Sequence, residues 1–208
     1  MKRYLSILGS SVLAGILIGL AAIVKLQTDR ITGSLLFGLG LLLICILDLF
    51  LYTGKIGKVL DEKPKYLLDL AVGLAGNFIG IVILCKALLL TSIGPGLKEA
   101  ALLIVNAKES SPWYSTLILS IFCGFMIYFA VIAYNKSESG FIKALSVMLC
   151  ITFFILSGYE HCIANAGYYA LCGAFNAHMI LSFILFILGN SIGSIIIDLL
   201  FKLKKIEK

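Results

Sequence analysis

The octapeptide Gly76–Ile83 (GNFIGIVI) recurs near the other end of the chain as Gly189–Ile196 (GNSIGSII), with identity at a Gly, an Asn, an Ile, a second Gly and a final Ile. The two copies end the third and the sixth apolar segments. Since each half then holds an odd number of membrane crossings, the second half is expected to run through the membrane in the opposite direction. Inverted repeats of this kind build many transport folds, and the Gly-x-x-Gly spacing also lets helices pack closely.

Composition independently places the chain in a membrane. Of its 208 residues, 61% are hydrophobic and 13% are charged, whereas soluble domains carry about 25% charged residues. The mean hydropathy is +1.07. A water-soluble globule of this size cannot hide so much apolar surface, which excludes soluble enzymes, nucleic-acid-binding proteins and disordered proteins. At about 20 residues per membrane-spanning helix, we predict one all-α membrane domain, residues 1–208, with six transmembrane helices. The predicted spans are Leu5–Val24, Gly33–Tyr52, Leu67–Leu90, Trp113–Tyr134, Phe141–Gly158 and Met179–Phe201.

The distribution of basic residues predicts the topology. With both termini on one side of six spans, most of the Lys and Arg residues gather on that side, and only Lys25, Arg30, Lys98 and Lys108 fall on the other. An excess of Lys and Arg marks the cytoplasmic side, so we predict a multi-pass protein of the cytoplasmic (inner) cell membrane with both termini cytoplasmic. Anionic lipid headgroups explain the net charge of +6 without a nucleic-acid partner. Because the first span ends at Lys25 and not at a small-residue cleavage site, it is expected to be retained.

The cysteines do not indicate a disulfide framework or a metal site. All of them lie in apolar segments, and none is part of a Cys-x-x-Cys pair. They are Cys45, Cys85, Cys123, Cys150, Cys162 and Cys172. Such residues are typical of small buried hydrophobes. We therefore expect no bound metal and no cofactor.

Two patches of glycine and small polar residues interrupt the second and fifth spans. They are Leu51–Lys55 (LYTGK) and Ser157–Asn165 (SGYEHCIAN). Unwound backbone at membrane depth is tolerated only where protein or a water-filled cavity satisfies its polar groups. The patches therefore predict broken helices, paired across the repeat, that face a substrate path. The stretch Cys162–Phe175 is predicted to be a short or re-entrant helix that continues the fifth span.

Ionisable residues at membrane depth are costly, so each is a candidate for function. Glu160 and His161 are adjacent in the broken fifth span, and Asn165 follows one turn later. A histidine titrates near neutral pH and can donate or accept a proton, which suits a path for small weak acids. Glu160 is expected to fix helices more than to touch substrate. For the charges near span ends we favour a structural role in which they reach the interface; these are Asp48, Asp69, Lys86 and Asp198.

At residues 159–165 (YEHCIAN) the sequence resembles the formate/nitrite transporter family, whose fifth span is broken at a Phe-Glu-His-x-Ile-Ala-Asn motif. Three further features agree in order and spacing: Lys143–Leu145 (KAL), Leu51–Gly54 (LYTG) against the family's Leu-Phe-Thr-Gly, and the two Gly-Asn-x-Ile-Gly segments. The likeness extends from Leu13–Gly15 to the sixth span.

This resemblance implies an aquaporin-like protomer with its own pore, assembled as a homo-pentamer in the lipid membrane. It implies that His161 is the central pore histidine and that Thr53 hydrogen-bonds opposite it. Lys108, by composition alone a solvated loop charge, falls where the family has a lysine that draws the anion inward. Glu160 and Asn165 match residues that fix the broken fifth span. Two apolar slits flank the histidine in the family, and the residues at their positions are Phe37, Leu41, Leu51, Tyr52 and Phe154.

The chain departs from the family pattern at several positions. Lys55 replaces the usual Asn after Thr53-Gly54, and Phe50 stands where an acidic residue is expected. Gly124 stands where formate channels often carry a pore-lining Asn. Loss of that amide is expected to widen one slit or make it less polar, so hydrosulfide and nitrite remain possible substrates in addition to formate.

The sequence thus predicts a channel or proton-linked transporter for small monovalent weak-acid anions, namely formate, nitrite or hydrosulfide. The alternative is a neutral-solute channel of the water or glycerol type, which is disfavoured because the chain has no Asn-Pro-Ala pair and its prolines, Pro64, Pro95 and Pro112, fall in expected loops. An enzyme is not expected, because no nucleophile or metal ligands accompany Glu160 and His161. A structural subunit without a pore is disfavoured by the buried charges.

Overall fold

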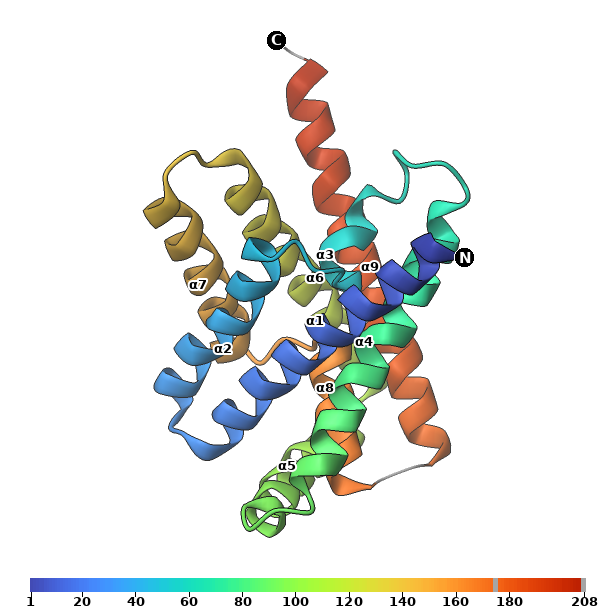
Figure 1. The fold of residues 1–208 in the computed structure, drawn as a ribbon. Helices are drawn as coiled ribbons and strands as arrows, with labels where there is room; N and C mark the ends of the chain where they lie inside the picture. The colour runs from blue at the N-terminus through green and yellow to red at the C-terminus, as the bar shows by residue number, and fades with distance from the viewer. Residues whose placement is uncertain (174–175, 207–208) are drawn as a thin grey trace.

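The computed structural model describes residues 1–173 and 176–206 and consists of helices joined by short connections (Figure 1). The helices are α1 (Lys2–Gln27), α2 (Arg30–Ile46), α3 (Tyr52–Lys55), the short 3-10 helix η1 (Ile56–Lys58), α4 (Tyr66–Leu88), α5 (Gly94–Glu109), α6 (Trp113–Lys136), α7 (Gly140–Leu156), α8 (Cys162–Cys172) and α9 (Ala177–Ile206). The predicted all-α class is therefore confirmed. The end of the predicted Cys162–Phe175 helix, at Phe175, lies outside the described residues.

Four of these helices, α1, α4, α6 and α9, are long and apolar enough to cross a membrane. The apolar helices α2 and α7 are shorter, with 17 residues each. Within the predicted spans Gly33–Tyr52 and Phe141–Gly158, the helices end at Ile46 and Leu156, and the chain continues into α3 and α8.

The ends of α2 and α7 have the same cause. Asp48 and Gly158 adopt left-handed backbone conformations, with φ of 46° and 73°. When the residue just after a helix adopts the left-handed conformation, the N–H of the following residue can donate to the carbonyl oxygen five positions earlier, in the last turn of the helix. Leu49 N accordingly donates to Ile44 O at 2.9 Å, and Tyr159 N donates to Phe154 O at 3.1 Å.

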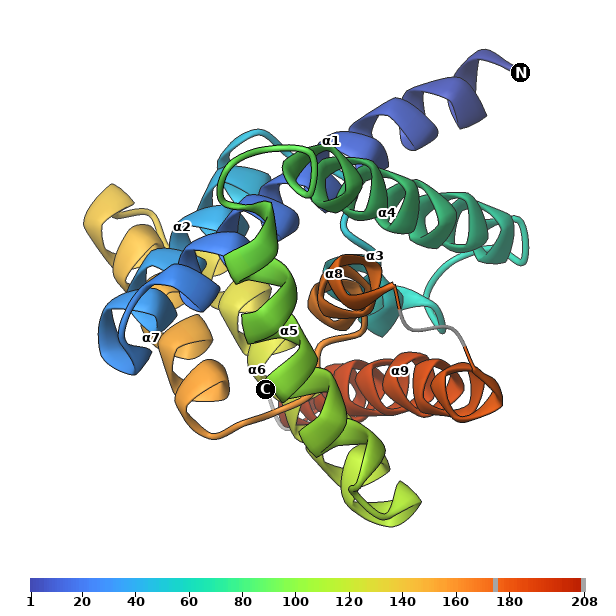
Figure 2. The same cartoon turned by 90° about the horizontal axis from the view of Figure 1, so that it is seen from below.

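Viewed as ribbons, α2 and α7 lie on one side of the fold and α4 and α9 on the other, with α3 and α8 in the middle (Figures 1 and 2). The start of α1 and the end of α9 lie in the half of the molecule that holds the connection from η1 to α4, and α5 lies at the opposite end (Figure 1). The central position of α3 and α8 brings the two interrupted segments of the chain together.

The glycines of the repeated octapeptide lie where helices cross most closely. A Cβ on Gly80 would lie 2.1 Å from Val12 O of α1, and a Cβ on Gly193 would lie 2.1 Å from Ile121 O of α6. The pairs α1/α4 and α6/α9 therefore pack in the same way, with backbone against backbone. This is the close approach that small residues permit between helices in a membrane.

We expect Gly193→Ala to destabilise the protein by about 1–3 kcal/mol, the usual cost of overpacking, because the added methyl meets the rigid backbone of α6. Unfolding in mixed detergent micelles would measure it. Gly9→Ala is the matched control, since a Cβ there has no neighbour within 4 Å. Equal stability of the two variants would contradict the tight crossing.

Helix α5 stands where the sequence suggested only the third loop. Pro95 lies in its first turn, where proline is well tolerated because its missing N–H has no helical partner, so the expectation that all three prolines lie in loops was wrong for Pro95. Leu97, Ala101 and Val105 are buried along one face. Sequence reasoning missed the helix because its apolar stripe is narrow and its length is below that of a span.

Two of the four charges expected at span ends are buried carboxylates that form ion pairs with partly exposed cations. Asp69, 2% exposed as a side chain, pairs with Arg3 of α1, and Asp198 pairs with Lys202 one turn later and accepts a hydrogen bond from Tyr128. Both carboxylates therefore link helices and are buried, whereas the sequence suggested that they reach the interface.

Candidate functional site

His161 is buried at the centre of the fold, with 2% of its surface exposed. It is the N-cap residue of α8, where its Nδ1 accepts a hydrogen bond from Ala164 N at 3.2 Å. An accepting Nδ1 carries no proton, so the proton of the neutral ring is on Nε2. Nε2 lies 3.0 Å from Thr53 Oγ1 of α3. The structure therefore joins the two interrupted segments through one hydrogen bond between these side chains.

Glu160, Lys108 and Asn165 form a second cluster beside the histidine. Glu160 Oε2 accepts hydrogen bonds from Lys108 Nζ and from Asn165 Nδ2, the latter at 2.8 Å. Lys108 lies in the last turn of α5, and its side chain is 15% exposed. The side chain is thus not a solvated loop charge. The cluster ties α5 and α8 to the segment that precedes His161.

The backbone on either side of His161 is held by Asn190 of α9. Asn190 Oδ1 accepts from Cys162 N at 2.9 Å, and its Nδ2 donates to Glu160 O at 2.7 Å and to Ser120 O at 2.8 Å. An asparagine amide offers an acceptor and two donors, and these three backbone groups use them all. Asn190 therefore fixes where the histidine stands.

Asn77 of α4 does the same in the other half of the repeat. Asn77 Oδ1 accepts from Tyr52 N at 2.9 Å, and its Nδ2 donates to Phe50 O at 2.9 Å and to Ser11 O at 2.8 Å. The residue held in this way is Leu51. These two asparagines are the paired Asn of the repeated octapeptide, so the repeat itself was the signal for a role that sequence reasoning missed.

The repeat thus places Leu51 and His161 in equivalent positions. Leu51, at the start of α3, has φ −101° and ψ 121°, and His161, at the start of α8, has φ −101° and ψ 119°. One half of the repeat therefore supplies an apolar side chain where the other supplies an imidazole.

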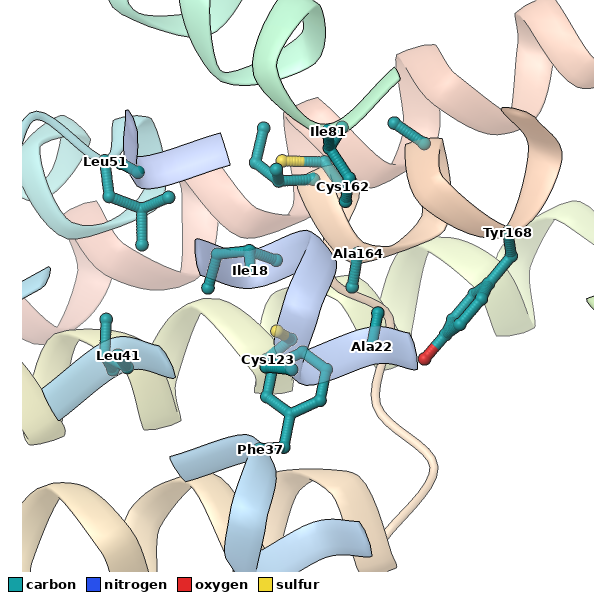
Figure 3. Packing of buried hydrophobic residues seen from close by; sticks show 14 of the residues in the cluster. Ile18, Ala22, Phe37, Leu41, Leu51, Ile81, Cys123, Cys162, Ala164 and Tyr168 are labelled. Carbon is teal, nitrogen blue, oxygen red and sulfur yellow. The ribbon is translucent and has the colours of Figure 1, made fainter. Parts of the chain in front are cut away.

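Apolar side chains surround the histidine. Phe154 lies 6.1 Å from the His161 ring and packs edge-on against Phe37, with 6.0 Å between ring centres. Phe37, Leu41 and Leu51 belong to one buried cluster around α1 (Figure 3). A hollow of about 50 Å³ reaches Leu41 and Leu51 from the side of α2 and α6.

Two further residues of the predicted site contact α9. The Tyr52 hydroxyl shares a 2.8 Å hydrogen bond with Ser191 Oγ of α9. A Cβ on Gly124 would lie 2.4 Å from Asn190 O, so Gly124 forms the α6/α9 crossing. The direction in which a side chain at this position would extend is filled by the backbone of α9.

Lys25 is a cation of this region that sequence reasoning counted only as a flanking charge. It lies in the last turn of α1, and its Nζ donates to Tyr168 Oη at 3.4 Å and stands 5.2 Å from the centre of that ring. Tyr168 is buried in α8. The only sequence signal was a lone lysine at the end of an apolar span.

Comparison with known proteins gives consistent likenesses. A family model described as formate/nitrite transporter matches residues 2–203. The formate channel FocB of Escherichia coli K12 is 28% identical over 148 residues, which are 65% of this chain and 52% of that protein. The formate channel FocA of Haemophilus influenzae is 27% identical over 148 residues, 65% of this chain and 51% of that protein. The chain thus spans about half the length of the curated relatives it matches.

Solved structures show the same fold. One described as a pentameric formate channel with formate bound superposes with a TM-score of 0.84 at 23% identity, covering 100% of this chain and 99% of the other. One described as an FNT family ion channel gives a TM-score of 0.80 at 23% identity, covering 97% and 90%.

Proposed function

The chain belongs to the formate/nitrite transporter family, and from this premise we propose that it is a channel or proton-linked transporter for small monovalent anions of weak acids, namely formate, nitrite or hydrosulfide. The observation that carries the proposal is the 3.0 Å contact between His161 Nε2 and Thr53 Oγ1. It places a polar, proton-bearing pair among apolar side chains where two helices begin. The family of transporters and the absence of an Asn-Pro-Ala pair favour this over a neutral-solute channel.

We propose that α2 with α3 and α7 with α8 complete two further membrane crossings beside α1, α4, α6 and α9. The protomer then has six spans, two of them broken, in an aquaporin-like inverted repeat. The matched asparagine contacts and the matched glycine crossings of the two halves support it. By analogy with the pentameric relative, the chain forms a homo-pentamer in the cytoplasmic membrane, with both termini cytoplasmic.

Anion entry is assigned to the positive charge near α5. Lys108 is neutralised by Glu160, so we assign the attraction to Lys25, which in the described part of the chain has the neutral phenol of Tyr168 as its partner. An anion is attracted by such a charge but loses hydration on entering an apolar passage, whereas its protonated form loses far less. Transfer across the apolar part therefore favours the neutral acid.

His161 and Thr53 lie where that change of form is needed. With its proton on Nε2, His161 donates to Thr53 Oγ1, so the rotatable Thr53 hydroxyl hydrogen is left to donate to a passing carboxylate, nitrite or sulfide. The proton that neutralises the anion comes either from His161 or from bulk water relayed past it. Phe37, Leu41, Leu51 and Phe154 keep the passage apolar on both sides.

Flux measurements test the proposal. The protein in liposomes, given gradients of formate, nitrite or hydrosulfide, is expected to carry more anion as the pH falls, because the protonated fraction grows. His161→Ala is expected to reduce flux about tenfold or more, since a hydrogen bond to a charged group is worth about 1.5–3 kcal/mol. Thr53→Val is expected to do the same, and Thr53→Ser serves as its control because it keeps the hydroxyl.

Three other outcomes would contradict the proposal. Osmotic swelling that is indifferent to these substitutions would indicate a water or glycerol channel. Product formation without flux would indicate an enzyme. Anion flux that is unchanged in His161→Ala would show that the imidazole is not part of the permeation path.

A further inference from the structure

An open hollow of about 370 Å³ lies between α4, α8 and α9. These three helices lie side by side on the part of the fold away from α2 and α7 (Figure 2). Its volume is within the range of about 300–1,000 Å³ found for small-molecule pockets. Its walls include Phe78 and Val82 of α4, Ala166 and Ala170 of α8 and Phe183 of α9. None of these side chains belongs to the His161 site.

The hollow runs along the helices and has one charged end. Phe78, Val82 and Lys86 are spaced four residues apart on α4 and all line it. At about 1.5 Å per residue they cover about 12 Å, most of the about 15 Å of hydrocarbon in one leaflet. Lys86 lies in the last turn of α4, beside the end of α8 at Gly173 and the start of α9. The ammonium group therefore marks the end of the hollow nearest the membrane surface.

Among the described residues that line the hollow, Lys86 is the only charged one, and it is exposed. Within residues 1–173 and 176–206, no carboxylate forms an ion pair with it. An apolar slot of nearly one leaflet's depth with an unneutralised cation at its mouth matches an acyl chain joined to an anionic headgroup. A lysine near the surface attracts such headgroups.

We propose that this hollow binds one acyl chain of an anionic phospholipid, with the lipid phosphate at Lys86. The acyl chain lies against Ala166 and Ala170 and so completes the packing of α8, which begins next to His161. The bound lipid thereby packs against α8, the helix whose N-cap is His161, on the side that lines the hollow. The inference depends on the chain spanning a membrane and not on which anion it carries.

A tryptophan reporter tests the proposal. In the full chain with Trp113→Phe, which removes the only tryptophan, Phe183→Trp places a reporter in the hollow. Vesicles of phosphatidylcholine with brominated phosphatidylglycerol would quench it on contact. We expect quenching at a brominated phosphatidylglycerol fraction about fivefold lower than that needed with brominated phosphatidylcholine, the factor for one lysine near an anionic surface.

The controls separate a bound lipid from the surrounding bilayer. Ile184→Trp, on the next residue of α9, which is exposed, is expected to show no preference between the two lipids. Lys86→Gln is expected to abolish the preference of the Phe183→Trp reporter, and Lys86→Arg is expected to keep it. Equal quenching by both lipids, or a reporter at position 183 that neither lipid quenches because a second copy of the chain covers it, would overturn the proposal.

Discussion

Lys108→Met is expected to destabilise the protein by about 3–5 kcal/mol, the cost of leaving one member of a buried ion pair alone. Glu160 would keep its charge among buried groups with Asn165 as its remaining side-chain partner. Glu160→Gln is expected to have a similar effect, because it leaves the Lys108 ammonium without a carboxylate. Unfolding in mixed micelles would measure both losses.

The double variant Lys108→Met/Glu160→Gln separates stability from transport. With both charges removed, most of the stability is expected to return, since a buried pair adds little beyond its own desolvation cost. Because Glu160 already neutralises Lys108, anion flux is expected to return with the stability; flux that stays low would show that Lys108 itself draws the anion inward. The control is Lys55→Met, whose partner Asp48 is exposed, so it should cost no more than about 1 kcal/mol. A Lys108→Met protein as stable as the Lys55→Met protein would contradict the buried pair.

Asn190→Leu is expected to abolish flux while the chain still inserts into the membrane. The substitution leaves Cys162 N, Glu160 O and Ser120 O without the partner that each has now, at about 1–3 kcal/mol for each unsatisfied buried group. Because two of these groups flank His161, its ring would no longer be held opposite Thr53. Asn190→Asp is expected to fail as well, since a carboxylate cannot donate to the two carbonyl oxygens.

Hydrogen exchange would distinguish loss of positioning from general unfolding. In Asn190→Leu we expect faster exchange at the Cys162 amide while the amides in the middle of α1 stay protected. Asn77→Leu is the matched variant. It is expected to leave Tyr52 N without its hydrogen-bond acceptor and so to displace Thr53 from its contact with His161. Ser191→Ala, which loses one hydrogen bond to Tyr52, is the mild control at about 0.5–1.5 kcal/mol. Normal flux through Asn190→Leu would show that the amide does not position the histidine.

The family and the all-helical class could be predicted from the sequence. Apolar runs of span length are a local property, so α1, α4, α6 and α9 follow from hydropathy alone. The string around Glu160 and His161 is also local, and the family match over residues 2–203 confirms what it indicated. The sequence could place Thr53 opposite His161 only through the resemblance, because the two residues are far apart in the chain.

The sequence by itself determined which segments must be removed from water. It also determined which few polar residues in those segments are costly to bury. Only the tertiary structure decided that the Asn77 and Asn190 amides hold Leu51 and His161, that Gly124 lies at a helix crossing, and that Lys25 approaches Tyr168. Each of these depends on which faces of distant helices meet. Hydropathy and motif spacing describe each segment separately, whereas hydrogen bonds and close contacts are set by the relative positions of two segments.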